Sequence, residues 1–151
     1  MLFILLKYVH VISAIVAVGA NVTYGIWIVR ASRWPENLPF TLQGIKFIDD
    51  KIANPAYVML LITGLAMMHF AQIPISTSWL LVSMALYVLV VLLGLLGYTR
   101  TLRRQIEVLV AQGAGSPAYR AIARRGHRFG ASIGVLVLAI VFLMVVKPAL
   151  W

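Results

Sequence analysis

Two histidines inside strongly apolar stretches are the residues of this chain whose type and spacing could do chemistry. His10 stands in KYVHVISAIV, and His69 follows two methionines in LAMMHF. An ionisable side chain in such a segment is a functional candidate, because lipid offers it no partner. Imidazole nitrogens are ligands for haem iron and for copper. The simpler alternative is a hydrogen bond from each histidine to a neighbour such as Ser13 or a backbone carbonyl.

The positions of the two histidines along their predicted helices place them at a similar depth. With a helical rise of ~1.5 Å per residue, each lies ~9 Å from the middle of its helix, towards the same side. Because two imidazoles at the same depth can bind one iron, we predict that His10 and His69 are axial ligands of a b-type haem. The alternative is a copper site that adds Met68 or Met67 to His10 and His69, because thioethers favour Cu(I). The sequence is also compatible with no cofactor.

The remaining residues carry no recognisable catalytic motif. The chain has no cysteine, which excludes disulfides, iron–sulfur clusters and thiolate metal sites. His127 stands among arginines and is interpreted as an ordinary interfacial residue. All carboxylates fall in predicted connections between helices, and these are Glu36, Asp49, Asp50 and Glu107. Whether the protein is an enzyme stays open, and a cofactor would bring most of any chemistry.

The composition of the chain indicates a membrane protein, so these residues are expected to lie on transmembrane helices. The chain has 151 residues, of which 62% are hydrophobic and 11% charged, and its mean hydropathy is +0.97. A soluble domain of this size could not bury so much apolar surface. Runs long enough to span a bilayer, which needs about 20 apolar residues, cover residues 2–29, 54–73, 78–98 and 129–146. The sequence therefore predicts an all-α fold, with residues 1–151 forming a single four-helix transmembrane bundle.

The basic residues predict the orientation of this bundle. Eleven of the 13 lysines and arginines fall in the connections 30–53 and 99–128, and one lysine lies near each terminus. Because cytoplasmic loops carry excess Lys and Arg, both connections are predicted to be cytoplasmic and both termini to lie outside. The net charge of +9 is then a topology signal and does not indicate nucleic acid. The lipid bilayer is the predicted partner, and a homo-oligomer or a larger membrane complex stays open.

The two basic connections have different predicted structures. In SRWPENLPF, Pro35 and Pro39 are expected to break any helix. The following GIKFIDDKI predicts a short helix lying in the membrane interface. The connection 99–128 is helical in pattern on both sides of QGAGSP, which is typical of a turn. We therefore expect a helical hairpin that extends into the cytoplasm between helices three and four.

The first helix carries a polar and small-residue stripe that indicates its inward face. Lipid offers His10 and Asn21 no partner, so this face is expected to point into the bundle. The residues of the stripe are His10, Ser13, Ala14, Ala17, Asn21 and Tyr24.

Four segments resemble a group of small bacterial membrane proteins. They are KYVHVISAIVAVG, NPAYVMLLITGLAM, SWLLVSMALYVLV and FLMVVKP, and together they span nearly the whole chain. The group includes CopD-type copper-resistance proteins, HemJ-type protoporphyrinogen oxidases and a large family of predicted integral membrane proteins of unknown function. The chain is most similar to the last.

The resemblance implies a four-helix bundle with little assigned chemistry. Our functional hypothesis is a protein of the bacterial cytoplasmic (inner) membrane with an accessory or electron-transfer role. Haem-binding relatives use the histidine of the first helix as a ligand, which corresponds to His10. Two positions depart from the HemJ pattern, because Ser83 stands where a lysine is expected and Ala17 where a tryptophan often occurs. These departures argue against protoporphyrinogen oxidase activity. A copper-handling protein, a haem-dependent oxidoreductase and a structural subunit of a larger complex remain the alternatives.

Overall fold

The computed structural model describes all 151 residues, and every regular element in it is helical. Two short π-helical segments, η2 and η3, each join two α-helices into one continuous rod. The elements in order are α1 (Leu2–Ala31), η1 (Pro35–Asn37), α2 (Leu38–Ile48), η2 (Asp49–Ala53), α3 (Asn54–Phe70), α4 (Ser78–Leu92), η3 (Leu93–Tyr98), α5 (Thr99–Gln112) and α6 (Pro117–Val146).

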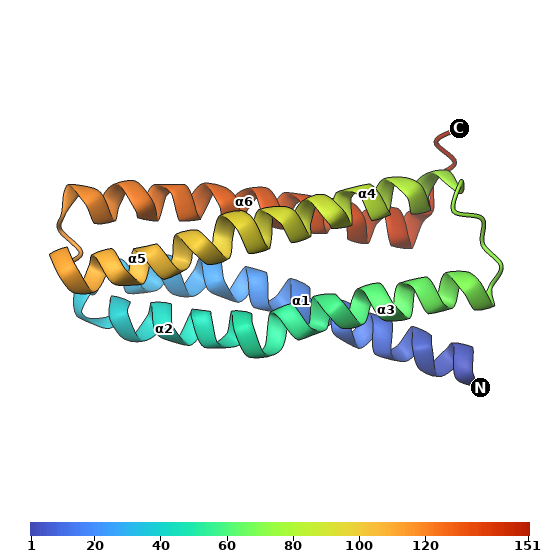
Figure 1. Ribbon diagram of the computed structural model, residues 1–151, viewed down its shortest axis with the longest axis horizontal. Helices are drawn as coiled ribbons and strands as arrows, with labels where there is room; N and C mark the ends of the chain where they lie inside the picture. The colour runs from blue at the N-terminus through green and yellow to red at the C-terminus, as the bar shows by residue number, and fades with distance from the viewer.

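These elements form four antiparallel rods, each long and apolar enough to cross a membrane (Figure 1). Their bounds are Leu2–Ala31, Pro35–Phe70, Ser78–Gln112 and Pro117–Val146. The all-helical fold and the four membrane-length helices predicted from the sequence are confirmed.

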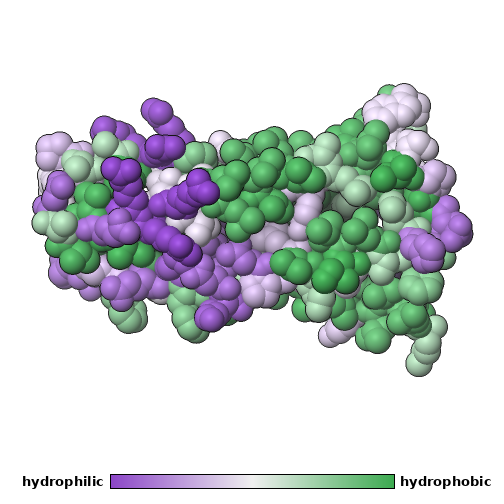
Figure 2. All heavy atoms as spheres, in the orientation of Figure 1, coloured by the Kyte–Doolittle hydropathy of each residue, from purple (hydrophilic) through white to green (hydrophobic).

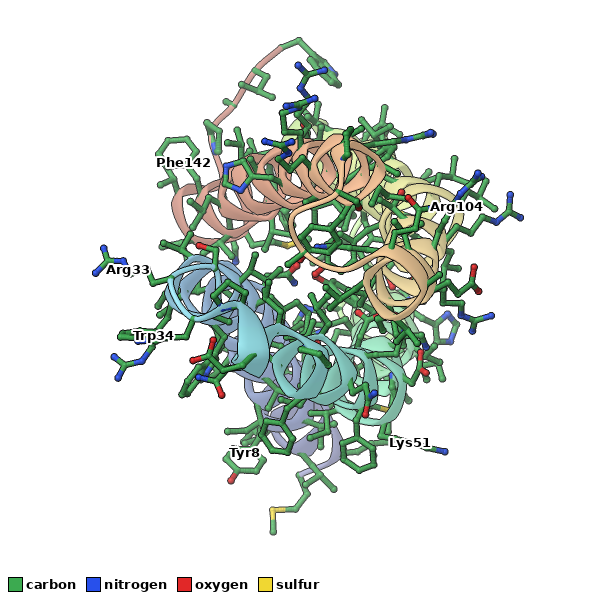
Figure 3. The ribbon with its side chains drawn as sticks, turned by 90° about the vertical axis from the view of Figure 1, so that its left-hand side faces the viewer. Tyr8, Arg33, Trp34, Lys51, Arg104 and Phe142 are labelled. Atoms are coloured by element: carbon green, nitrogen blue, oxygen red, sulfur yellow. The ribbon has the colours of Figure 1, made fainter.

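The two ends of the bundle differ in polarity. Rods of 30 to 36 residues are about 45–54 Å long at 1.5 Å per residue, whereas a hydrocarbon core is about 30 Å thick. Figure 2 shows that hydrophilic residues gather over one half of the length and hydrophobic residues over the other. We call the first half the polar end and the opposite one, which holds both termini, the terminus end (Figure 1). Figure 3 looks onto the polar end, where Arg33, Lys51 and Arg104 point away from the bundle.

The interfacial helix predicted for the connection 30–53 is wrong. Instead of lying across the bundle, α2 continues through η2 into α3 as one rod (Figure 1). The prolines do not prevent this, because Pro35 begins η1 and Pro39 stands in the first turn of α2. A proline is tolerated there, since the first backbone N–H groups of a helix have no intrahelical partner. The second rod therefore starts about five turns before residue 54, at which the predicted apolar span begins.

The hairpin expected for the connection 99–128 is not a separate extension. The α5 helix and the first half of α6 do pack against each other, but α2 also packs on α5. The polar end is therefore a continuation of the whole bundle. The turn between α5 and α6 forms as its sequence predicts, because the Ser116 hydroxyl caps α6 by accepting a hydrogen bond from the Tyr119 amide.

Two helix pairs make up the apolar half. The most extensive packing joins α1 to α3 and α4 to α6, whereas α3 and α4 scarcely touch. Figure 1 shows α3 and α4 diverging towards the terminus end. The inward face predicted for α1 is confirmed in large part, because Ser13, Ala17 and Tyr24 are buried. Within the first pair, a side-chain N–H of Asn21 in α1 donates to the Tyr57 hydroxyl in α3 at 2.6 Å.

Candidate functional site

His10 lies against α3 in the apolar half of the bundle. Its Nδ1 is 2.9 Å from Oγ1 of Thr63, a residue only 3% exposed. The absence of a side chain at Gly64 makes room for the ring, because a Cβ there would stand 3.3 Å from Cε1 of His10. The short polar residue and the glycine together let the imidazole pack directly onto the neighbouring backbone.

The hydrogen bonds of Thr63 determine which nitrogen of His10 carries the proton. The Thr63 hydroxyl donates its one hydrogen to the carbonyl oxygen of Met59, at 2.6 Å. Because that oxygen then accepts from His10, we assign the proton of the imidazole to Nδ1. Nε2 consequently keeps its lone pair. A metal-ligating histidine usually has this arrangement, with the other ring N–H held by a neighbouring acceptor.

The structure does not place His69 at the depth of His10. His10 is level with Thr63 and Gly64, and His69 lies five to six residues further along α3, which is about 8–9 Å. The His69 side chain is exposed, and its ring stands edge-on to Phe70, with the centroids 5.8 Å apart. The expectation of equal depth is therefore wrong. It assumed a span centred near residue 63, whereas the helix is continuous from residue 35.

The methionines lie on the same helix as His69. Met67 and Met68 are both half-buried. Met67 stands one turn after Thr63, so helical spacing puts it on the face of α3 that meets His10. No group of three or more His, Cys, Asp or Glu side chains is arranged to hold a metal ion. His127 is exposed at the polar end, far from His10 along the bundle.

The two positions that depart from the HemJ pattern are buried. Ser83 is fully buried and donates its hydroxyl hydrogen to the carbonyl of Trp79, one turn earlier in α4. Ala17 is 1% exposed in α1. Both side chains are therefore small groups in the packed interior of the bundle.

A second polar site joins η2 to the first residue of α5, which directly follows η3. Asp49, the first residue of η2, is buried, and it accepts a hydrogen bond from the Thr99 hydroxyl, at 3.1 Å. Burial raises the pKa of the Asp49 carboxyl, and the Thr99 hydrogen bond opposes that rise. Asp49 lies outside the apolar segments of the rods. Segments of π-helix are frequent at functional sites.

The sequence contained a signal for this buried carboxylate. Leu42, Ile45 and Asp49 follow one another at helical spacings of three and four, and all three are buried. Ala53 and Ala56 continue the same buried face. Extending the apolar periodicity of α2 into α3 would have placed Asp49 inside the bundle. The interfacial helix that we expected within residues 30–53 placed Asp49 outside the bundle instead.

The fold and the intramembrane histidine define a class of protein. Four membrane-length helices in antiparallel order, with a histidine held inside the apolar half, make this a small polytopic membrane protein. The chain belongs to the family of predicted integral membrane proteins described as DUF2269, whose model matches residues 4–148. No curated protein and no solved structure matches the chain.

Proposed function

We propose that this protein binds a b-type haem through Nε2 of His10 and serves as an accessory or electron-transfer protein of the membrane. The observation that supports the proposal is the hydrogen bond between Nδ1 of His10 and Thr63, which favours the tautomer whose Nε2 is available as a ligand. A haem in this place would supply a one-electron redox centre. The residues of this chain would bind the iron, orient the imidazole through Thr63 and keep water away.

The packing around His10 limits how such a group could be held. The imidazole contacts α3 at Gly64, and α1 and α3 are the most closely associated pair. A macrocycle does not fit between directly packed helices, which are about 8–10 Å apart. His69 at its different depth is a poor second ligand for the same iron. The proposal therefore uses His10 as the one histidine ligand.

A copper site is the second candidate, and the position of Met67 favours it. A single ion needs far less room than a macrocycle, and a thioether one turn from Thr63 is a suitable Cu(I) ligand. Met68 and His69, which follow Met67 on α3, are the other candidate ligands from the sequence. An oxidoreductase of the HemJ type is a weaker candidate, because Ser83 and Ala17 replace residues of that pattern.

The orientation is part of the proposal. Eleven of the 13 basic side chains belong to the polar end, so we place that end in the cytoplasm and both termini outside. The membrane is then the cytoplasmic membrane of a bacterium. His10 lies towards the outer surface in this orientation. Arginines at the polar end would lie near anionic headgroups.

A visible spectrum and a metal analysis of the purified wild-type protein test the cofactor. The proposal predicts a Soret band and about one haem per chain, with a reduced spectrum typical of a b-type haem. About one copper ion per chain without a Soret band would contradict the haem and favour the copper site. The absence of both would overturn the cofactor and favour a structural subunit, which should then co-purify with a larger assembly.

A further inference from the structure

A cavity of about 310 Å³ lies between α3 and α4. It falls where these helices scarcely touch, so no close helix packing seals it on that side. Most of its lining is apolar, with Val58, Leu61, Val88 and Leu95 among the lining residues. Its volume is in the range of small-molecule sites, which are apolar pockets with a few convergent polar groups.

The polar groups of this cavity are gathered near the two π-helical segments. The polar lining residues are Asn21, Asp49, Asn54, Tyr57, Tyr87, Tyr98 and Thr99. They come from three of the four rods, so the fold brings them together from distant parts of the sequence. The cavity thus combines an apolar body with one polar region.

Asp49 is a buried carboxylate without a basic partner. It is 7% exposed, and its hydrogen bond comes from the neutral hydroxyl of Thr99. The only ion pair in the structure joins its neighbours Lys46 and Asp50. Buried carboxylates are normally paired with a cation or a metal, because an isolated buried charge is costly. Lys46, the cation that faces Asp49, is paired with Asp50 and makes no ion pair with Asp49.

The Tyr98 hydroxyl is a second group without a partner. Tyr98 is 8% exposed, and its hydroxyl makes no hydrogen bond although it is buried. Tyr98 lines both this cavity and a neighbouring one of about 220 Å³, where the similarly unpartnered Tyr24 also lies. The Tyr24 and Tyr98 rings are stacked, with their centroids 6.3 Å apart. A buried polar group is expected to have a partner, so these hydroxyls indicate a missing one.

We infer that the cavity between α3 and α4 binds an amphipathic amine, whose protonated nitrogen pairs with Asp49 and whose apolar body lies between the two helices. An ammonium group donates several hydrogen bonds, which the Asp49 carboxylate and the Tyr98 oxygen can accept. Tyr57, Tyr87 and Tyr98 also line this cavity, and a tyrosine ring can add a cation–π attraction to the ammonium group. An anionic ligand would be repelled by Asp49, and a neutral one would leave the carboxylate unpaired.

The test is a binding titration of the purified protein in detergent with 4-phenylbutylamine. The matched neutral and anionic probes are 4-phenylbutan-1-ol and 4-phenylbutyrate. Empty micelles correct for partition into detergent. We expect the amine to bind more tightly than either matched probe. Asp49→Asn, which keeps an acceptor for Thr99, should weaken amine binding by about tenfold or more. Glu36→Gln removes an exposed carboxylate outside the cavity lining and should leave binding unchanged.

A second variant keeps the test decisive if Asp49→Asn does not fold. Tyr98→Phe removes an unpartnered buried hydroxyl, so the ligand-free protein should melt at the same temperature or higher. Its affinity for the amine should nevertheless fall, whereas Tyr8→Phe at the exposed terminus end should change neither. No amine binding to the wild type, equal binding of the alcohol, or unchanged amine affinity in both Asp49→Asn and Tyr98→Phe would overturn the inference.

Discussion

Nδ1 of His10 lies 2.9 Å from Oγ1 of Thr63, and this contact joins the first and third α-helices of the bundle inside its apolar half. Since the Thr63 hydrogen is donated to the Met59 carbonyl, the contact also sets the tautomer of the imidazole. One hydrogen bond therefore has a structural consequence and a chemical one. The two consequences can be separated by substitution.

Thr63→Val tests the structural consequence. Valine has nearly the same shape but leaves the buried Nδ1–H of His10 without its acceptor. We expect a loss of about 1–3 kcal/mol in the free energy of unfolding, measured by thermal or denaturant unfolding in detergent. Thr23→Val is the matched control, because the exposed Thr23 hydroxyl bonds only to its own helix, at the Gly19 carbonyl. A loss as large in the control would contradict a specific role for Thr63.

Gly97→Ala tests the contact between η3 and α6. A Cβ at Gly97 would stand 2.6–3.0 Å from three ring atoms of Phe129. Such overpacking typically costs about 1–3 kcal/mol, so Tm should fall. Gly134→Ala is the control, because a Cβ there meets nothing within 4 Å, and it should leave Tm unchanged or raise it. A Gly97→Ala protein as stable as the control would show that this contact is looser than described.

The buried Asp49 carboxyl predicts a pH-dependent stability. Burial raises its pKa in the folded protein, so the folded state binds this proton more tightly than the unfolded state. Its contribution to stability is then greatest below the ordinary carboxyl pKa and is lost as the pH rises towards the raised value. The charged or titratable groups that face Asp49 are Lys46, Asp50, Tyr24, Tyr57 and Tyr98.

Melting curves between about pH 4 and pH 8 measure this dependence. The wild type should lose more stability over that interval than Asp49→Asn, and the asparagine variant should be the more stable protein at neutral pH. Glu36→Gln should retain the wild-type loss, because Glu36 is an exposed carboxylate that does not act on Asp49. Parallel curves for wild type and Asp49→Asn would mean that Asp49 does not experience the burial described.

The orientation is testable because the chain has no native cysteine. Single cysteines at Ser76, in the connection at the terminus end, and at Ala118, at the polar end, are both exposed positions. In intact cells, a membrane-impermeant maleimide should label Ser76→Cys and not Ala118→Cys. Disrupted cells should give labelling of both. The reverse pattern in intact cells would place the polar end outside.

Hydropathy alone was sufficient to predict the four transmembrane helices, because an apolar run of this length has few alternatives. The stripe from His10 to Tyr24 also gave the correct inward face of α1. The continuous rod from Pro35 to Phe70 was missed, since Pro35 and Pro39 were treated as helix breakers. Their positions at helix starts, where proline is tolerated, became evident only from the fold.

The site was harder to predict because the relative depth of two helices depends on how they pack. Composition could place His10 and His69 near the same surface, but the contact of His10 with Thr63 and Gly64 determines the offset between α1 and α3. The contact between Asp49 and Thr99 likewise depends on how the helices pack. These residues are far apart in sequence, and only the pairing of the second and third rods brings them within 3.1 Å.

The most direct test of the central claim is the absorption spectrum of three histidine variants, purified after expression with ample haem. Our account predicts that His10→Ala loses the Soret band, whereas His69→Ala and His127→Ala keep it at wild-type intensity. Circular dichroism would confirm that all three proteins remain helical. A folded His10→Ala protein that keeps the full Soret band would contradict the assignment of His10 as the ligand.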